Sequence, residues 1–200
     1  MAVQKLTKKG YGQLEINVGI FSRTGNIEAQ MPLDPEEFPA DELDKVAENG
    51  MLFAVDRVKK VLKKATRELA KTHLIGMNYS TEHMYDPRLN YSYRNFALHG
   101  GEDFLPRIGF MTKGEEFHTN TVCYDTGTFA AESNLIDAFG ELDTTPLYAG
   151  IASDGSGYWE ITKTLPTAGP IAQVVEYATM PDGQHCVVLS IIGFGEVTSA

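Results

Sequence analysis

Histidine and cysteine are the residues of this chain that could bind a metal, and their spacing does not favour it. The five histidines and two cysteines form no CxxC, HExxH or mixed motif with metal-ligand spacing. His83 and Asp86 could share a metal ion only on a helix, and Pro87 would make that helix short. We therefore expect no metal site and no cofactor.

Cys186 is the candidate for a thiolate nucleophile, because a charged His185 beside it would lower the pKa of the thiol. Adjacent strand residues point to opposite faces, so we expect these two side chains to diverge. Two thiols make no disulfide framework, and we expect Cys123 and Cys186 to be free and semi-buried. The sequence has no GxSxG elbow and no phosphate-binding glycine loop. We predict no catalytic residue, with a small intracellular hydrolase that uses Cys186 or His118 as an alternative.

The elements from residue 107 onward are predicted to be mostly strands. A turn signal, Pro181-Asp182-Gly183-Gln184, separates the last two of five short apolar segments. One helix is expected among them, with Thr128 as its N-cap and an apolar stripe from Leu135 to Leu142. This pattern predicts a small β-barrel or sandwich. The predicted strands are Arg107–Thr112, Phe117–Tyr124, Tyr158–Thr164, Ile171–Ala178 and Cys186–Ile192.

The N-terminal part is predicted to contain a β-hairpin over residues 11–33. Apolar residues alternate with polar ones over 14–20, and residues 22–26 have the composition of a turn. Residues 55–71 are ambiguous. Apolar spacings of three and four favour an amphipathic helix, whereas Met51–Val55 and Lys60–Lys63 could instead form a hairpin around Asp56-Arg57.

Residues 76–106 combine tyrosine, asparagine and arginine with little periodic pattern. The segment is too aromatic for a disordered linker, and long ordered loops are usually functional. We interpret it as a long extended arm that joins a β-rich unit, 1–75, to the barrel or sandwich unit, 107–200. The predicted fold is thus mainly β with one or two short helices.

The net charge of −10 argues against a general nucleic-acid binder. Residues 1–75 carry 12 basic and 11 acidic residues, whereas residues 76–200 carry 5 and 16. Seven of the basic residues lie within 57–71, where Glu68 is the single acid. Such a cluster is either a solvated face or a contact surface for an acidic partner. The sequence contains no run of about 18 apolar residues, so it predicts no membrane span. The first residues lack the apolar core of a secretory signal.

Several turn-and-strand segments resemble virion proteins of tailed bacteriophages that are found beside the major capsid gene. The resemblance covers roughly residues 49–192 and contains no catalytic motif. The segments that carry it are Asn49–Asp56, Tyr79–Asp86, Pro106–Phe110, Lys113–Asn120 and Thr179–Gln184.

The resemblance implies a head decoration (cement) protein, mostly β, that binds the capsid exterior in many copies and locks neighbouring subunits. Its partners would be the major capsid protein and copies of itself, with no nucleic acid and no membrane, and it would be synthesised in the host cytoplasm. It also implies that Met51–Lys63 forms a hairpin rather than a helix, and we adopt that prediction. Another virion component, from the neck, tail or head-fibre base, is the alternative.

Candidate contact residues follow from the tyrosine-rich arm and the basic cluster, since tyrosine and arginine are typical of interfaces. No catalytic or metal-binding residue is carried over from the resemblance. The predicted capsid or partner contacts are Tyr79, Met84, Tyr85, Arg88, Tyr91, Tyr93, Arg94, Lys59, Lys60 and Lys63.

Overall fold

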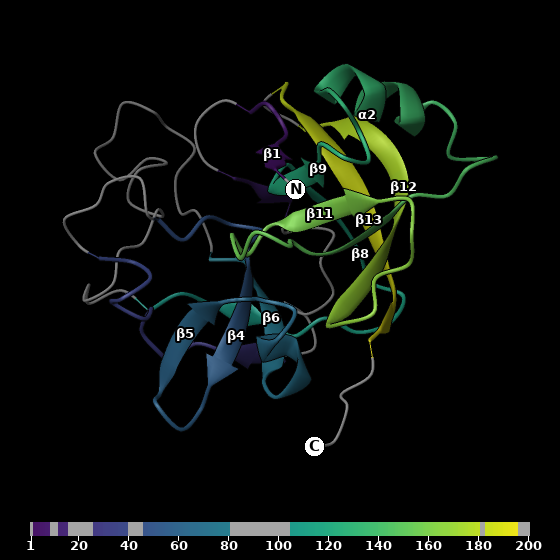
Figure 1. Cartoon of the computed structure of the whole chain (residues 1–200). Coiled ribbons are helices and arrows are strands. Elements are labelled where there is room, and N and C mark those ends of the chain that lie inside the picture. Colours follow the sequence, from purple (N-terminus) through teal and green to yellow (C-terminus); the bar gives the residue numbers. More distant parts are fainter. Residues whose placement is uncertain are drawn as a thin grey trace.

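The computed structural model describes residues 2–8, 12–15, 26–39, 46–80, 105–180 and 183–195 (Figure 1). These residues form two β-sheets, one α-helix and one short 3-10 helix. The prediction of a mainly β fold with one or two short helices is therefore confirmed. The helices are α2 (Glu132–Phe139) and η1 (Leu69–Lys71).

Sheet A has eight strands, in the order β1-β9-β11-β10-β12-β13-β8-β2. All neighbours are antiparallel except β9 and β11, which are parallel. Among the described residues β1 and β2 lie at opposite edges, so no closed barrel is found. Its strands are β1 (Val3–Lys5), β2 (Leu14–Glu15), β8 (Glu116–Thr119), β9 (Val122–Asp125), β10 (Tyr148–Ile151), β11 (Trp159–Thr162), β12 (Pro170–Thr179) and β13 (His185–Phe194).

Sheet B has five antiparallel strands, in the order β3-β7-β6-β4-β5. β4 and β5 form the hairpin implied by the resemblance, and that prediction is confirmed. The helix favoured by periodicity over 55–71 is wrong, because β4 is buried on both faces between β5 and β6. The strands are β3 (Ile27–Glu28), β4 (Leu52–Asp56), β5 (Val61–Lys64), β6 (Leu74–Asn78) and β7 (Ile108–Gly109).

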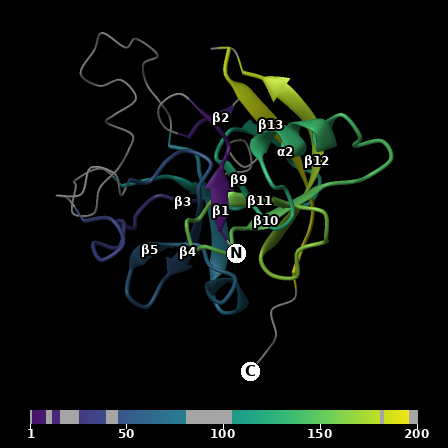
Figure 2. The ribbon, with the colours of Figure 1, turned by 45° about the horizontal axis from the view of Figure 1, so that its top comes forward.

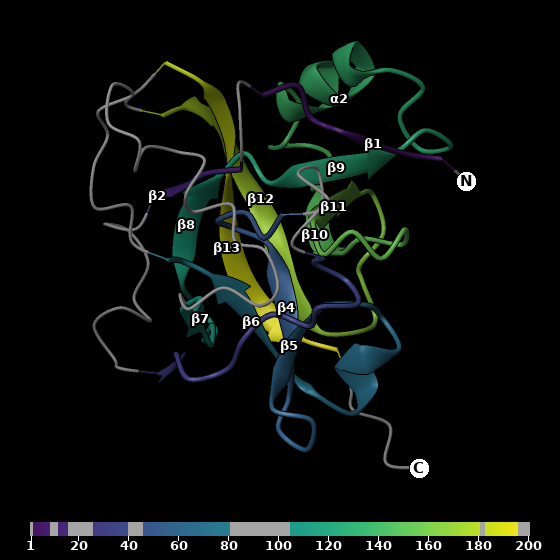
Figure 3. The ribbon, with the colours of Figure 1, turned by 90° about the vertical axis from the view of Figure 1, so that its left-hand side faces the viewer.

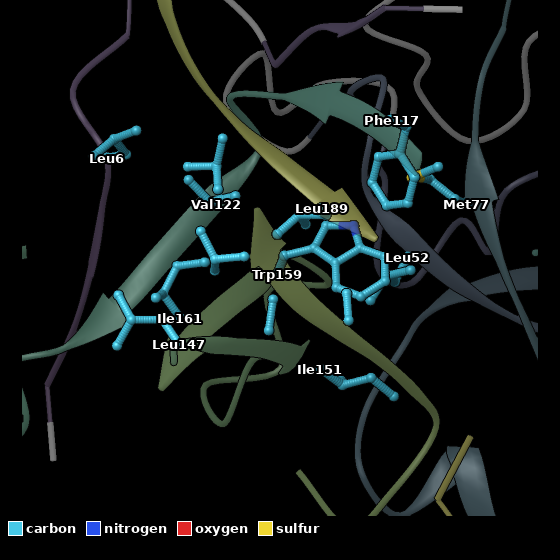
Figure 4. Packing of buried hydrophobic residues seen from close by; sticks show 14 of the residues in the cluster. Leu6, Leu52, Met77, Phe117, Val122, Leu147, Ile151, Trp159, Ile161 and Leu189 are labelled. Atoms are coloured by element: carbon cyan, nitrogen blue, oxygen red, sulfur yellow. The ribbon is translucent and has the colours of Figure 1, made fainter. Parts of the chain in front are cut away.

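The larger of two hydrophobic clusters joins the two sheets, and Figure 4 shows it around Trp159. Trp159 of β11 and Phe117 of β8 come from sheet A, and their ring centroids lie 5.6 Å apart. Leu52 of β4 and Met77 of β6 reach the same cluster from sheet B. A buried aromatic ring of this size removes much apolar surface from water, so this cluster is a principal source of cohesion between the sheets.

Both sheets combine strands from either side of residues 76–106. β1 pairs with β9 and β2 pairs with β8 in sheet A, and β3 pairs with β7 in sheet B. Main-chain hydrogen bonds thus join the predicted units 1–75 and 107–200.

The predicted hairpin over residues 11–33 is not formed by its described strands. Leu14 of β2 is paired with Thr119 in sheet A, whereas Ile27 of β3 is paired with Gly109 in sheet B. Alternation correctly indicated strands there, but it carries no information about which strand is the neighbour.

The predicted strand Phe117–Tyr124 is two strands, β8 and β9, separated by Asn120 and Thr121. β10 was not predicted as a strand. The helix starts later than expected, with Ala131 as its N-cap. Thr128 lies in the preceding turn, where its backbone N–H donates to the carbonyl of Asp125 (3.0 Å). α2 packs against β12 (Figure 2).

Candidate functional site

The described residues on either side of 81–104 lie side by side in sheet B. β6 and β7 are antiparallel neighbours, with Asn78 paired to Ile108. Just beyond them, the backbone N–H of Tyr79 donates to the carbonyl of Arg107 (3.0 Å), and the N–H of Arg107 donates to Ser80 Oγ (3.1 Å). Residues 81–104 therefore begin and end at adjacent positions. We call Asn78, Tyr79, Ser80 and Arg107 the loop base.

Buried hydrogen bonds hold the loop base in place. Asn78 Nδ2 donates to the carbonyl of Glu48 (3.0 Å), and Ser80 Oγ donates to Asn78 Oδ1 (2.7 Å). Asn49 Nδ2 donates to the carbonyl of Ser80 (2.9 Å), and the N–H of Gly50 donates to the carbonyl of Asn78 (2.8 Å). Buried side-chain networks of this kind restrict local motion, so the base is a fixed platform for the segment that it carries.

Tyr79, one of the predicted contact residues, belongs to this platform rather than to the surface. Its side chain is 3 % exposed and packs in the shared core. Burial raises the pKa of its hydroxyl. We therefore remove Tyr79 from the contact surface. The other predicted contacts from this segment, Met84, Tyr85, Arg88, Tyr91, Tyr93 and Arg94, lie outside the described residues.

The turn between β4 and β5 presents a basic hairpin tip, which we define as Arg57, Val58, Lys59 and Lys60. All four residues are exposed, and Val58 is 93 % exposed. The carboxylate of Asp56 shapes the turn by accepting the backbone N–H groups of Lys59 (2.9 Å) and Val58 (3.1 Å). These bonds lower the pKa of Asp56. Lys60 has a φ of +56°, in the left-handed region.

The predicted basic contacts divide into two kinds. Lys59 and Lys60 are exposed on the hairpin tip, as a contact surface requires. Lys63 is half-buried, and its Nζ lies 3.8 Å from a carboxylate oxygen of Asp34 and 3.9 Å from one of Asp56. Because these two carboxylates already neutralise it, Lys63 is not an outward-facing contact.

The hairpin tip and the loop base lie at opposite ends of sheet B. β4 is antiparallel to β6, with Leu52 beside Met77 and Val55 beside Leu74. The tip follows the end of β4 that carries Val55, whereas the base follows the end of β6 that carries Met77. Within the part of the chain that the structure describes, Lys59 and Lys60 therefore do not share a patch with Tyr79.

A buried tyrosine cluster, which the sequence analysis did not identify, surrounds Tyr158. Its hydroxyl donates to Glu48 Oε2 and accepts from Lys8 Nζ (2.9 Å) and Lys5 Nζ (3.1 Å). Lys8 also pairs with Glu48, which accepts the N–H of Gly12 (2.9 Å). Both lysine ammonium groups lie over the tyrosine ring, 4.2 and 4.7 Å from its centroid. No spacing links residues 5, 8, 48 and 158, so no sequence motif could have identified the cluster.

The electrostatics of this cluster suit a structural lock better than proton transfer. Burial, with the negative charge of Glu48, raises the pKa of Tyr158 well above its ordinary value of 10.0. Burial lowers the pKa of Lys8, although Glu48 acts in the opposite direction. A general acid works best with a pKa near the working pH, and the shift of Tyr158 leads away from it. The cluster holds β1 and the residues after it against the core.

The two cysteines form no disulfide with each other. Both are fully buried, more deeply than the semi-buried position expected from the sequence. Burial, followed by the charges of Asp154 and Glu160, raises the pKa of Cys123 well above the ordinary value of a thiol. His185 is exposed while Cys186 is buried, so the two diverge as predicted. Within the described residues no group of three histidine, cysteine or acidic side chains could hold a metal ion.

No protein-family model matches the chain, and no curated protein or solved structure matches it at a significant level. Among the described residues, none of the helices is long and apolar enough to cross a membrane. The function must therefore be argued from the loop base, the hairpin tip and the resemblance of the sequence.

Proposed function

We propose that this protein is a non-enzymatic head decoration protein of a tailed bacteriophage, which binds the major capsid protein on the outer surface of the shell through residues 81–104. The observation that carries the proposal is the loop base. Asn78 and Ile108 are paired on neighbouring strands, so the described residues on either side of this segment are held at two adjoining points. Binding segments are commonly loops that a rigid scaffold positions.

The composition of residues 81–104 supports contact with another protein. The segment carries Tyr85, Tyr91 and Tyr93 with Arg88 and Arg94. Tyrosine and arginine are enriched at the centres of interfaces, because each combines a broad apolar surface with a hydrogen-bonding end. Fixing both ends of such a segment lowers the conformational entropy that is lost when it binds.

The net charge of the chain and a barrel or sandwich fold are also part of this proposal. A net charge of −10 keeps a protein present in many copies soluble and disfavours contact with nucleic acid. We propose that the strands of residues 107–200, with β1 and β2 at the two edges of their sheet, form a small barrel or sandwich. Register shifts at Ile171/Ala172 and Val174/Glu176 support it, since bulges bend a sheet toward closure.

A co-sedimentation experiment tests the proposal. Heads of the parent phage, stripped of this protein, are mixed with the wild-type chain or with the Tyr85→Ala/Tyr91→Ala variant. We expect the variant to keep its circular dichroism spectrum and to bind at least roughly tenfold more weakly, because truncated aromatic anchors commonly cost 1.4 kcal/mol or more.

A matched control removes two exposed apolar side chains elsewhere. Leu165→Ala/Phe194→Ala changes a surface that lies outside the tyrosine-rich segment, and it is expected to bind as the wild type does. Equal binding of the tyrosine variant and the wild type would contradict the proposed contact. Absence of binding by the wild-type chain would contradict the decoration role itself.

A further inference from the structure

The hairpin tip combines an apolar apex with positive flanks. Val58 stands almost fully in solvent between Arg57 and Lys59. Asp56, the acid nearest in sequence, is buried and uses its carboxylate to accept backbone N–H groups within the turn. The tip therefore presents a cationic surface with one apolar side chain at its centre, on a chain whose net charge is strongly negative.

A shallow hollow of about 420 Å³ between α2 and β12 carries negative rather than positive charge beside its apolar side chains. We call it the helix hollow. Ile136 is 39 % exposed there and Val175 is 46 % exposed. Phe139 and Tyr177 form part of its lining. Their rings are stacked, with centroids 4.9 Å apart and an angle of 14° between the ring planes. Packed rings make this part of the lining rigid, so the apolar surface is preformed.

Two carboxylates line the helix hollow, and two more lie next to its lining residues in sequence, where the chain has no lysine or arginine. Asp143 and Glu176 are exposed and line it, and Asp137 and Glu141 are exposed on or just after α2. The sequence has no lysine or arginine between Lys113 and Lys163, and none after Lys163. His185, exposed on β13, stacks on Tyr177 with ring centroids 5.1 Å apart. The lining of the hollow thus combines exposed apolar side chains with acidic ones, whereas the hairpin tip combines an apolar side chain with basic ones.

The two surfaces cannot meet within one molecule. The β4–β5 hairpin and α2 lie at opposite ends of the fold in two views at right angles (Figures 1 and 3). We propose that the hairpin tip of one copy docks into the helix hollow of a second copy, with Val58 against the apolar lining and Arg57, Lys59 and Lys60 facing the carboxylates.

Such a contact is heterologous, because a different surface of each copy takes part. Heterologous contacts produce rings when the rotation closes and open rows when it does not. A hairpin tip in a shallow hollow buries less than a standard interface of about 1,600 Å², so one contact is weak. Copies held side by side on a surface raise the effective concentration, and weak contacts then add to one another. The association goes beyond the proposed function and needs no capsid.

Charge reversal with mixing tests this pairing in the purified chain. Sedimentation velocity at increasing concentration is expected to reveal association that weakens at high salt, because exposed charges are screened. Lys59→Glu on the tip and Glu176→Lys at the hollow are each expected to weaken association at least roughly tenfold, since like charges then face one another. Val58→Ser tests the apolar part and is expected to weaken association at all salt concentrations.

The decisive experiment mixes the two charge-reversed variants, Lys59→Glu and Glu176→Lys. The acidic tip of Lys59→Glu matches the basic hollow of Glu176→Lys, so an equimolar mixture is expected to associate more strongly than either variant alone. Lys113→Glu and Glu116→Lys make the same charge changes at other exposed positions and are expected to leave association unchanged. A wild-type chain that stays monomeric up to millimolar concentration would overturn the proposal. So would control variants that weaken association as much as the test variants, or a mixture without recovery.

Discussion

At the scale of single residues, Tyr158 connects parts of the chain that are far apart in sequence. Its hydroxyl contacts Lys5, Lys8 and Glu48, which come from the N-terminal segment and from the residues before β4. Glu48 is buried and Lys8 is half-buried, whereas Lys5 is exposed, and the hydrogen bonds to Tyr158 offset part of the cost of removing the buried groups from water. The cluster is therefore expected to contribute to stability rather than to reactivity.

Replacing Tyr158 by phenylalanine is expected to lower the free energy of unfolding by about 1–3 kcal/mol, because Glu48 and both lysines lose a buried partner. Urea denaturation followed by circular dichroism measures the loss. Tyr124→Phe is the matched control, since the Tyr124 hydroxyl donates to Gln4 Oε1 (2.8 Å), on a side chain that is exposed. A loss no larger than that of the control would contradict the role of the cluster.

The raised pKa of Tyr158 predicts a loss of stability at alkaline pH. The unfolded tyrosine loses its proton near pH 10.0, whereas the folded one keeps it, so the folded state binds more protons and stability falls as pH rises. Lys8 acts in the opposite direction, but only below its ordinary pKa of 10.5. Above pH 10.5 the wild-type unfolding free energy should therefore fall more steeply than that of Tyr158→Phe, by about 1.4 kcal/mol per pH unit. Equal slopes, measured by urea titrations over this range, would contradict the assignment.

At the scale of elements, the loop base depends on the tight turn that leads into β4. Gly50 has a φ of +86°, in the left-handed region where residues with a Cβ are strained. A Cβ at this position would lie 2.5 Å from Thr119 Oγ1, and the N–H of Gly50 donates to the carbonyl of Asn78 in the base. Gly50 thus permits a close approach that fixes the position of the loop base.

We expect Gly50→Ala to lower the free energy of unfolding by about 2 kcal/mol or more, from backbone strain and overpacking together. Gly114→Ala is the control: its φ is +92°, but a Cβ there meets no atom within 4 Å. It is expected to show the strain without the overpacking, and therefore a smaller loss in thermal or urea denaturation. Losses of equal size would show that the close approach at Gly50 does not matter.

The elements that could be predicted from sequence were those with strong local patterns. The strands near Ile171–Ala178 and Cys186–Ile192 formed, because each is a compact, largely apolar segment and a turn signal separates them. The partners of short strands could not be predicted. Leu14 and Ile27 lie in different sheets, and strand pairing is decided by packing between distant segments. The same reason hid the cluster at Tyr158, whose members come from separate parts of the chain.

At the scale of the whole molecule, charge is distributed unevenly in both sequence and space. The excess of acidic residues after residue 75 was evident from the sequence. The structure adds that the basic hairpin tip and the acidic helix hollow lie at opposite ends of the fold (Figures 1 and 3). The loop base lies at the end of sheet B away from the tip, so a copy could contact a shell and a neighbouring copy through separate surfaces.

The central claim is that this protein covers a phage head in many copies. The most direct test is its molar ratio to the major capsid protein in purified particles, measured by quantitative mass spectrometry with labelled peptide standards. We predict a ratio of one, or a simple fraction of it that still follows the number of capsid subunits. A ratio that corresponds to a single ring of copies, or absence from the particle, would contradict the claim.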